Sequence, residues 1–173
     1  MDENTFWELI EKTHRASPHK IAIQYELLVQ ELVKLSPDEI IAFEAIFYTM
    51  YGRSNKANLW DAAAIIACGC SDSGFGAFQG WLIAQGRTIF ENALRDPESL
   101  ADVVEPQRRY DIINGSISGA AYDAYELMTG RKKPQTVYGP FTFIGELQVN
   151  VDDVSTYAVY PRLAAVFSDD CDD

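Results

Sequence analysis

Side chains that could bind a ligand or do chemistry gather between residues 60 and 87 of this 173-residue chain. Two carboxylates there could serve as general acid and base, a thiol could act as a nucleophile, and an arginine could hold an anion. Two tryptophans could shape a binding surface. The candidate binding residues are Trp60, Asp61, Cys70, Asp72, Trp81, Gln85 and Arg87. We assign none of them a catalytic role, because no complete catalytic set accompanies them.

The pair Ser71-Asp72 marks the turn between two helices that residues 60–87 would form. A helix N-terminus exposes backbone N–H groups and a partial positive charge, so a small anion could bind beside Asp72. In the simpler interpretation, Ser71 or Asp72 caps the second helix and Trp81 fills the core. We favour the simpler interpretation, because such caps are common and stabilise a helix by about 1 kcal/mol.

The cysteines give little support to covalent or metal chemistry. Cys70 precedes a helix start, where a thiol pKa can fall, but a nucleophilic cysteine usually works with a histidine base. The two histidines, His14 and His19, lie far away in the sequence, so an inert Cys70 is favoured. The Cys68-x-Cys70 spacing does not suit zinc, and three cysteines do not make a disulfide framework. We therefore expect no metal, no cofactor and a reducing, cytoplasmic location.

Apolar residues recur at helical spacing along most of the chain, and start and stop signals divide it into segments. The clearest start is Ser36-Pro37-Asp38-Glu39, with a serine cap followed by proline and two acids. Near the N-terminus, Thr5 and Glu8 fit a capping box. Further helices are predicted over 19–35, 59–67, 87–94 and 117–128. The pattern predicts a mainly α fold, a single compact bundle of about seven or eight helices.

Residues 136–149 are the one stretch without a helical period. Their sequence, TVYGPFTFIGELQV, is rich in residues that favour strands, but Gly139-Pro140 and Gly145 interrupt it. The stretch is therefore either a small β-hairpin or an ordered loop.

The chain is strongly acidic. It carries 26 acidic and 14 basic side chains, a formal net charge of −12. This excess disfavours nucleic acid and anionic membrane surfaces as partners, since both need a positive footprint. A basic protein is the partner that the charge would suit. We predict one helical domain over 1–167 and a short acidic tail over 168–173, with neither a signal peptide nor a membrane span.

Several motifs occur together in the N-terminal two thirds of the chain. They are Asn4-x-Phe6-Trp7-x-Leu9-Ile10, Ser36-Pro37-Asp38-Glu39-Ile40, Leu59-Trp60-Asp61-Ala62-Ala63, Gly69-Cys70-Ser71-Asp72-Ser73-Gly74-Phe75 and Gln85-Gly86-Arg87. With them the chain resembles DUF4240, a bacterial family of domains of unknown function, densely over 4–104 and again at Pro161-Arg162-Leu163. The resemblance implies a helical bacterial cytoplasmic domain and brings no reaction with it. Trp60, Cys70, Asp72, Phe75, Trp81, Gln85 and Arg87 match the family motif, which assigns them no roles.

Two functions remain open. The leading hypothesis is a non-enzymatic protein-binding or regulatory module, for example an immunity-like protein that blocks a basic partner. The alternative is a small-ligand-binding protein or enzyme that uses the helical hairpin of 60–87, with Asp61 and Asp72 as acid and base and Arg87 as an anion contact. One pocket lined by Asp61, Asp72 and Trp81 would favour the alternative, whereas burial of these side chains against backbone partners would count against it.

Overall fold

A computed structural model describes residues 1–136, 138, 141–150 and 152–167, and helices dominate this part of the chain. Its α-helices are α1 (Glu3–Ala16), α2 (Ile21–Leu32), α3 (Pro37–Arg53), α4 (Ala57–Ile66), α5 (Asp72–Ala84), α6 (Arg87–Arg95), α7 (Asp111–Asn114), α8 (Ala120–Thr129) and α9 (Pro161–Phe167). Short 3-10 helices add η1 (Pro97–Asp102), η2 (Pro106–Arg108) and η3 (Val154–Val159). The predicted mainly α fold is confirmed.

Local side-chain caps set the helix starts. The Ser36 hydroxyl accepts a hydrogen bond from the Glu39 backbone N–H, and the Glu39 carboxylate accepts one from the Ser36 N–H at 3.0 Å, which completes the capping box of α3. The expected box at Thr5 and Glu8 is wrong. Asp2 caps α1 instead, accepting from the Thr5 N–H at 2.8 Å, because the helix already begins at Glu3.

The core forms around α4 and α5. The apolar face of α4 is wholly buried, as its sequence predicts, and α5 packs against α1, α3 and α7. Gly80 allows α5 to lie close to the loop that follows α7, since a Cβ there would lie 1.9 Å from the Ser116 hydroxyl. Gly86, at φ +95°, ends the turn after α5 and also serves as the N-cap residue of α6. The tight α5–α6 corner therefore depends on a residue without a side chain.

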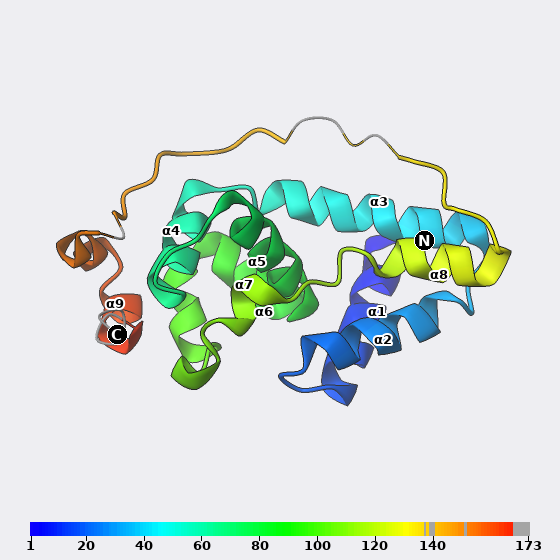
Figure 1. The fold of residues 1–173 in the computed structure, drawn as a ribbon, viewed down its shortest axis with the longest axis horizontal. Helices are drawn as coiled ribbons and strands as arrows, with labels where there is room; N and C mark the ends of the chain where they lie inside the picture. Colours follow the sequence, from blue (N-terminus) through cyan, green and yellow to red (C-terminus); the bar gives the residue numbers. More distant parts are fainter. Residues whose placement is uncertain (137, 139–140, 151, 168–173) are drawn as a thin grey trace.

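Figure 1 shows how the chain is arranged along its long axis. Helices α1, α2 and α8 lie towards one end, and α4 to α7 lie towards the other, with α3 running beside both groups. Helix α8 packs on α2 and α3, and α9 packs on α4 and η1. Between α8 and η3 the chain returns along the length of the molecule (Figure 1). We call the described residues of 131–150 the C-terminal strap.

The C-terminal strap is held by side chains rather than by a sheet. A β-hairpin does not form among the described residues of 136–149, so the ordered-loop alternative is the one observed. A single parallel bridge joins the strap to the start of α4: the Ile144 N–H donates to Asn55 at 3.0 Å, and the Ala57 N–H donates to Ile144 at 2.8 Å. Phe141 lies over Gly52 of α3, where a Cβ would come within 2.7 Å of its ring.

A buried ion pair fixes the first part of the C-terminal strap. The Lys133 ammonium lies 2.6 Å from the Glu44 carboxylate on α3, with both side chains below one-tenth exposed. Tyr138 stacks on Tyr48 at 4.0 Å between ring centroids, and its hydroxyl donates to Glu44 at 2.7 Å. Two groups of the strap, the Lys133 ammonium and the Tyr138 hydroxyl, therefore share one desolvated carboxylate on α3.

Three further sequence expectations concern the surroundings of the fold. Among the helices of the described residues, none is long and apolar enough to cross a membrane. Cys68 is disulfide-bonded, so the expectation that the cysteines are reduced is wrong at this position, while Cys70 is a free thiol. The cysteines therefore no longer argue for a reducing compartment. The predicted acidic tail, 168–173, lies outside the described residues.

Candidate functional site

An aromatic groove lies where the C-terminal strap meets α3, α4 and α5. It is an open hollow of about 420 Å³. Its lining residues are Tyr51, Asn55, Trp60, Asp72, Phe75, Gln79, Phe141 and Phe143. Two of the candidate residues, Trp60 and Asp72, are thus brought together on one concave surface. Aromatic side chains of this kind provide much of the binding energy at protein interfaces.

Trp60 is held in a fixed orientation in the aromatic groove. Its indole N–H donates to the Cys70 carbonyl at 2.9 Å, and its ring stacks on Phe75 at 4.6 Å between centroids. Phe143 of the strap meets Trp60 edge-on at 5.6 Å. Because these contacts already set its rotamer, a partner could contact the half-exposed ring without first ordering it.

Asp72 and Cys70 flank the start of α5, but neither caps it. The cap is Ser71, whose hydroxyl accepts from the Gly74 N–H at 3.2 Å. This leaves the exposed Asp72 carboxylate facing the aromatic groove. Burial, together with the neighbouring Asp72 charge, raises the pKa of the Cys70 thiol to about 11. The thiolate needed by a nucleophile is therefore disfavoured, in agreement with an inert Cys70.

Asp61 is a buried anchor for the C-terminal strap. Its carboxylate is 1% exposed and accepts hydrogen bonds from the backbone N–H groups of Gln148 and Val149, the shortest at 3.0 Å. The hydroxyl of Tyr160 donates to it at 3.1 Å. Asp61 therefore faces the strap and not the groove that Asp72 lines, so the two carboxylates do not form an acid–base pair.

Trp81 and Gln85 line a different site, a pocket of about 40 Å³ beside the ends of α1 and α5. Both histidines of the chain, His14 and His19, line the same pocket. We call it the histidine pocket. Gln85 caps α5 and donates to the Trp81 carbonyl at 3.0 Å. Nothing in the periodicity of the sequence indicates that the histidines reach Trp81, since the turn after α1 brings them there.

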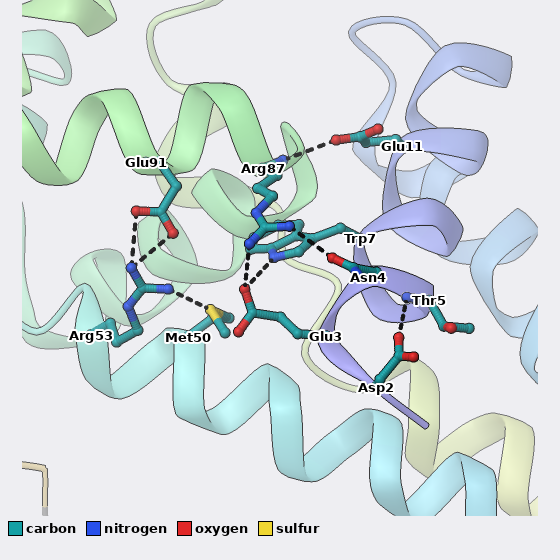
Figure 2. Close-up of polar contacts among 10 residues, drawn as sticks. All are labelled: Asp2, Glu3, Asn4, Thr5, Trp7, Glu11, Met50, Arg53, Arg87 and Glu91. Carbon is teal, nitrogen blue, oxygen red and sulfur yellow. Dashed lines mark hydrogen bonds and ion pairs between the residues drawn. The ribbon is translucent and has the colours of Figure 1, made fainter.

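Arg87 joins α6 to α1 and lines neither site (Figure 2). Its guanidinium donates to the Asn4 side chain at 3.0 Å and to the Glu3 carboxylate at 3.1 Å, while its backbone N–H donates to Glu11. Figure 2 also shows the neighbouring Arg53–Glu91 pair, which ties α3 to α6 at 2.8 Å. Arg87 is therefore engaged in joining helices rather than in contacting an anion.

The seven candidate residues thus do not form one site. The groove is lined by Trp60 and Asp72, and the histidine pocket by Trp81 and Gln85. Asp61 and Arg87 hold elements together, and Cys70 lines neither the groove nor the pocket. The sequence interpretation missed Phe141 and Phe143, although their spacing in a stretch without helical period was a visible signal. It also missed Gly52, over which the Phe141 ring packs.

The comparison with family models found one match. The model of DUF4240, described as a protein of unknown function, matches residues 1–127. The chain belongs to the DUF4240 family. The match includes both histidines and every candidate residue from Trp60 to Arg87, but neither the C-terminal strap nor Pro161-Arg162-Leu163. Searches of curated proteins and of solved structures each found no significant match.

Proposed function

We propose that this DUF4240 chain is a non-enzymatic protein-binding module whose contact surface is the aromatic groove. The observation that carries the proposal is the set of five aromatic rings around one open hollow. Such a surface suits burial against another protein, because stacked rings contribute large contact areas at low entropic cost. The proposal includes a bacterial origin for the chain and a cytoplasmic location for the protein.

The charge and the aromatic rings of the groove indicate which kind of partner it would bind. Asp72 is the charged residue among its lining side chains, and the chain as a whole carries a net charge of −12. A basic segment would therefore be attracted over long range and would find a carboxylate beside the aromatic rings. We expect the partner to present an extended segment with an arginine or lysine next to an aromatic or apolar side chain, which also suits a regulatory, immunity-like role.

An acid–base mechanism through Asp61 and Asp72 has less support. It requires both carboxylates to face one reacting molecule. Asp61 accepts three or more hydrogen bonds inside the protein and lines none of the described pockets, whereas Asp72 lies in the groove. The protein-binding hypothesis uses the groove without needing Asp61 to leave its partners.

The test is selection of random linear peptides on the immobilised full chain. Selected peptides should combine a basic residue with an aromatic one. Their affinity should fall by about ten-fold or more for Phe143→Ala, which removes a groove ring, and for Asp72→Asn, which removes the charge.

Tyr122→Ala is the matched control, because Tyr122 on α8 is exposed to nearly the same extent as Phe143, 38% against 39%. It should leave peptide affinity unchanged. Peptides without basic residues, or equal losses for Phe143→Ala and Tyr122→Ala, would overturn the proposal.

A further inference from the structure

The histidine pocket is lined by hydrogen-bond donors that have no partner among the residues the structure describes. Trp81 is 8% exposed and lines the pocket, yet its indole N–H donates to no residue that the structure describes. The His14 and His19 rings and the Lys20 ammonium line it too, and each is likewise without a hydrogen bond or ion pair to the described residues. The Trp81 N–H is not among the fully buried side-chain atoms that lack a partner, so it faces solvent in the pocket, where a ligand oxygen could take the place of water as its acceptor.

Lys20, like Lys132, belongs to the minority of lysines and arginines among the described residues that have no acceptor. Most lysines and arginines of the described residues have an acceptor, such as Lys12 with Glu31, Arg53 with Glu91 and Arg162 with Asp102. In a protein with almost twice as many acids as bases, pairing is easily achieved. The gathering of Lys20 with both histidines at one pocket is therefore not explained by a shortage of carboxylates.

Arg108 gives the pocket a pre-positioned cation. Its guanidinium donates to the His19 backbone carbonyl and pairs with the Asp111 carboxylate at 3.0 Å. Glu105, the other carboxylate at the pocket, accepts from the Gln107 side chain at 3.1 Å. Both acids are thus engaged, while the indole, imidazole and ammonium donors remain available to a ligand.

We propose that the histidine pocket binds a phosphate group. An acceptor-only ligand matches the unpartnered donors, and charge-assisted hydrogen bonds to an oxyanion are the strongest that such donors make. The volume of about 40 Å³ has room for about three waters, which suits one phosphate group and not a whole nucleotide. This site is separate from the aromatic groove, and its occupancy does not depend on the protein partner.

Apart from the histidines, the charges at the pocket are balanced. Two cations, Lys20 and Arg108, lie beside two carboxylates, Glu105 and Asp111.

The experiment titrates the full chain with inorganic phosphate and follows tryptophan fluorescence and the histidine ring signals in NMR spectra. We expect saturable binding that shifts both histidine signals. The double variant His14→Gln/His19→Gln removes both imidazole groups from the pocket and should weaken phosphate binding by about ten-fold.

Two further variants separate the contacts from general attraction. Trp81→Phe retains an aromatic ring but removes the indole N–H donor, so it should weaken phosphate binding. Glu105→Gln removes a negative charge at the pocket and should tighten binding. Lys132→Gln is the control, because Lys132 is an unpartnered basic residue outside the pocket. It should leave phosphate affinity unchanged.

A titration with glycerol phosphate identifies the source of the phosphate group. Tighter binding than inorganic phosphate would assign the pocket to a phosphomonoester, and weaker binding would assign it to the free ion. No saturable binding of phosphate would overturn the proposal, as would an equal loss of affinity in Lys132→Gln and His14→Gln/His19→Gln.

Discussion

Asp61 illustrates what decides the role of a single residue. The sequence shows an acid inside a nearly apolar helix, a pattern that fits a catalytic carboxylate and a structural one equally well. Its partners, Gln148, Val149 and Tyr160, lie far along the chain and come close only in the folded state. Local sequence cannot report such partners, so the structural role of Asp61 could not be predicted from the residues around it.

The burial of Asp61 leads to a prediction about stability. Asp61→Asn replaces one acceptor oxygen by an amide that points a donor at the strap N–H groups. The free energy of unfolding should fall by about 2 kcal/mol, because buried donors lose their acceptor. Urea unfolding followed by circular dichroism measures this change. Asp152→Asn, at an exposed acid near the strap, is the control and should change stability very little; an equal effect of both variants would contradict the anchoring role.

Among the elements, helix starts follow from local sequence better than the C-terminal strap does. The Ser36 cap of α3 lies beside a proline and two acids, so the local sequence predicted it, whereas the box predicted at Thr5 and Glu8 did not form. The conformation of the strap depends instead on contacts that Lys133, Tyr138 and Phe141 make with α3, which is distant in sequence. The sequence therefore left a hairpin and a loop as equal possibilities for this segment.

The Glu44–Lys133 pair allows the strap to be tested as an element. Glu44→Gln leaves a buried ammonium without its counter-ion and removes the charged acceptor of Tyr138, which should destabilise the protein by about 3 kcal/mol. Loosening of the strap should also speed trypsin cleavage at the Arg131-Lys132 sites. Limited proteolysis with mass spectrometry identifies these cuts. Glu146→Gln, at an exposed strap acid, should leave the cleavage rate unchanged, and faster cleavage in both variants would refute the assigned role.

At the scale of the whole molecule, three tyrosine–carboxylate hydrogen bonds connect distant elements. Tyr25 of α2 donates to Asp123 of α8 at 2.6 Å, Tyr138 of the strap to Glu44 of α3, and Tyr160 to Asp61 of α4. Burial, reinforced by the carboxylate that accepts each hydrogen bond, raises the pKa of all three phenols above the usual value of 10.0. We therefore expect the free energy of unfolding of the whole protein to change with pH in the alkaline range.

The sign of that dependence follows from proton binding. Above about pH 10 the tyrosines of the unfolded chain lose their protons, while the folded protein retains them. The folded state then binds more protons, so the free energy of unfolding should decrease as pH rises further. Urea midpoints at increasing pH, with tyrosinate absorbance followed in parallel, measure the effect.

Tyr160→Phe removes one of the three shifted groups and should flatten this decrease, whereas Tyr110→Phe, at an exposed tyrosine, should not. A stability that is independent of alkaline pH, or an equal slope in wild type and Tyr160→Phe, would show that these phenols are not linked to folding.

The global properties of the chain were predictable because they are sums over many residues. The periodic apolar positions of α3 and α4 gave the helical class, and the acid excess gave the charge character. The two sites are different, since each is formed by a few residues from separate elements. The sequence offered Trp60 and Trp81 as candidates for the same surface. Because Trp60 lies on α4 and Trp81 lies near the end of α5, they line different hollows.

The route of the C-terminal strap also constrains the order in which the chain can fold. The described residues of the strap form no β-ladder with one another and are held by contacts with α3 and the start of α4. We therefore expect these helices to form before the strap becomes ordered. Leu163 and Phe167 of α9 then complete the core against α4 and η1. We therefore expect the family-matched helices to assemble first and the last helix to dock late, so that a nascent chain exposes the α4 surface until its end has been synthesised.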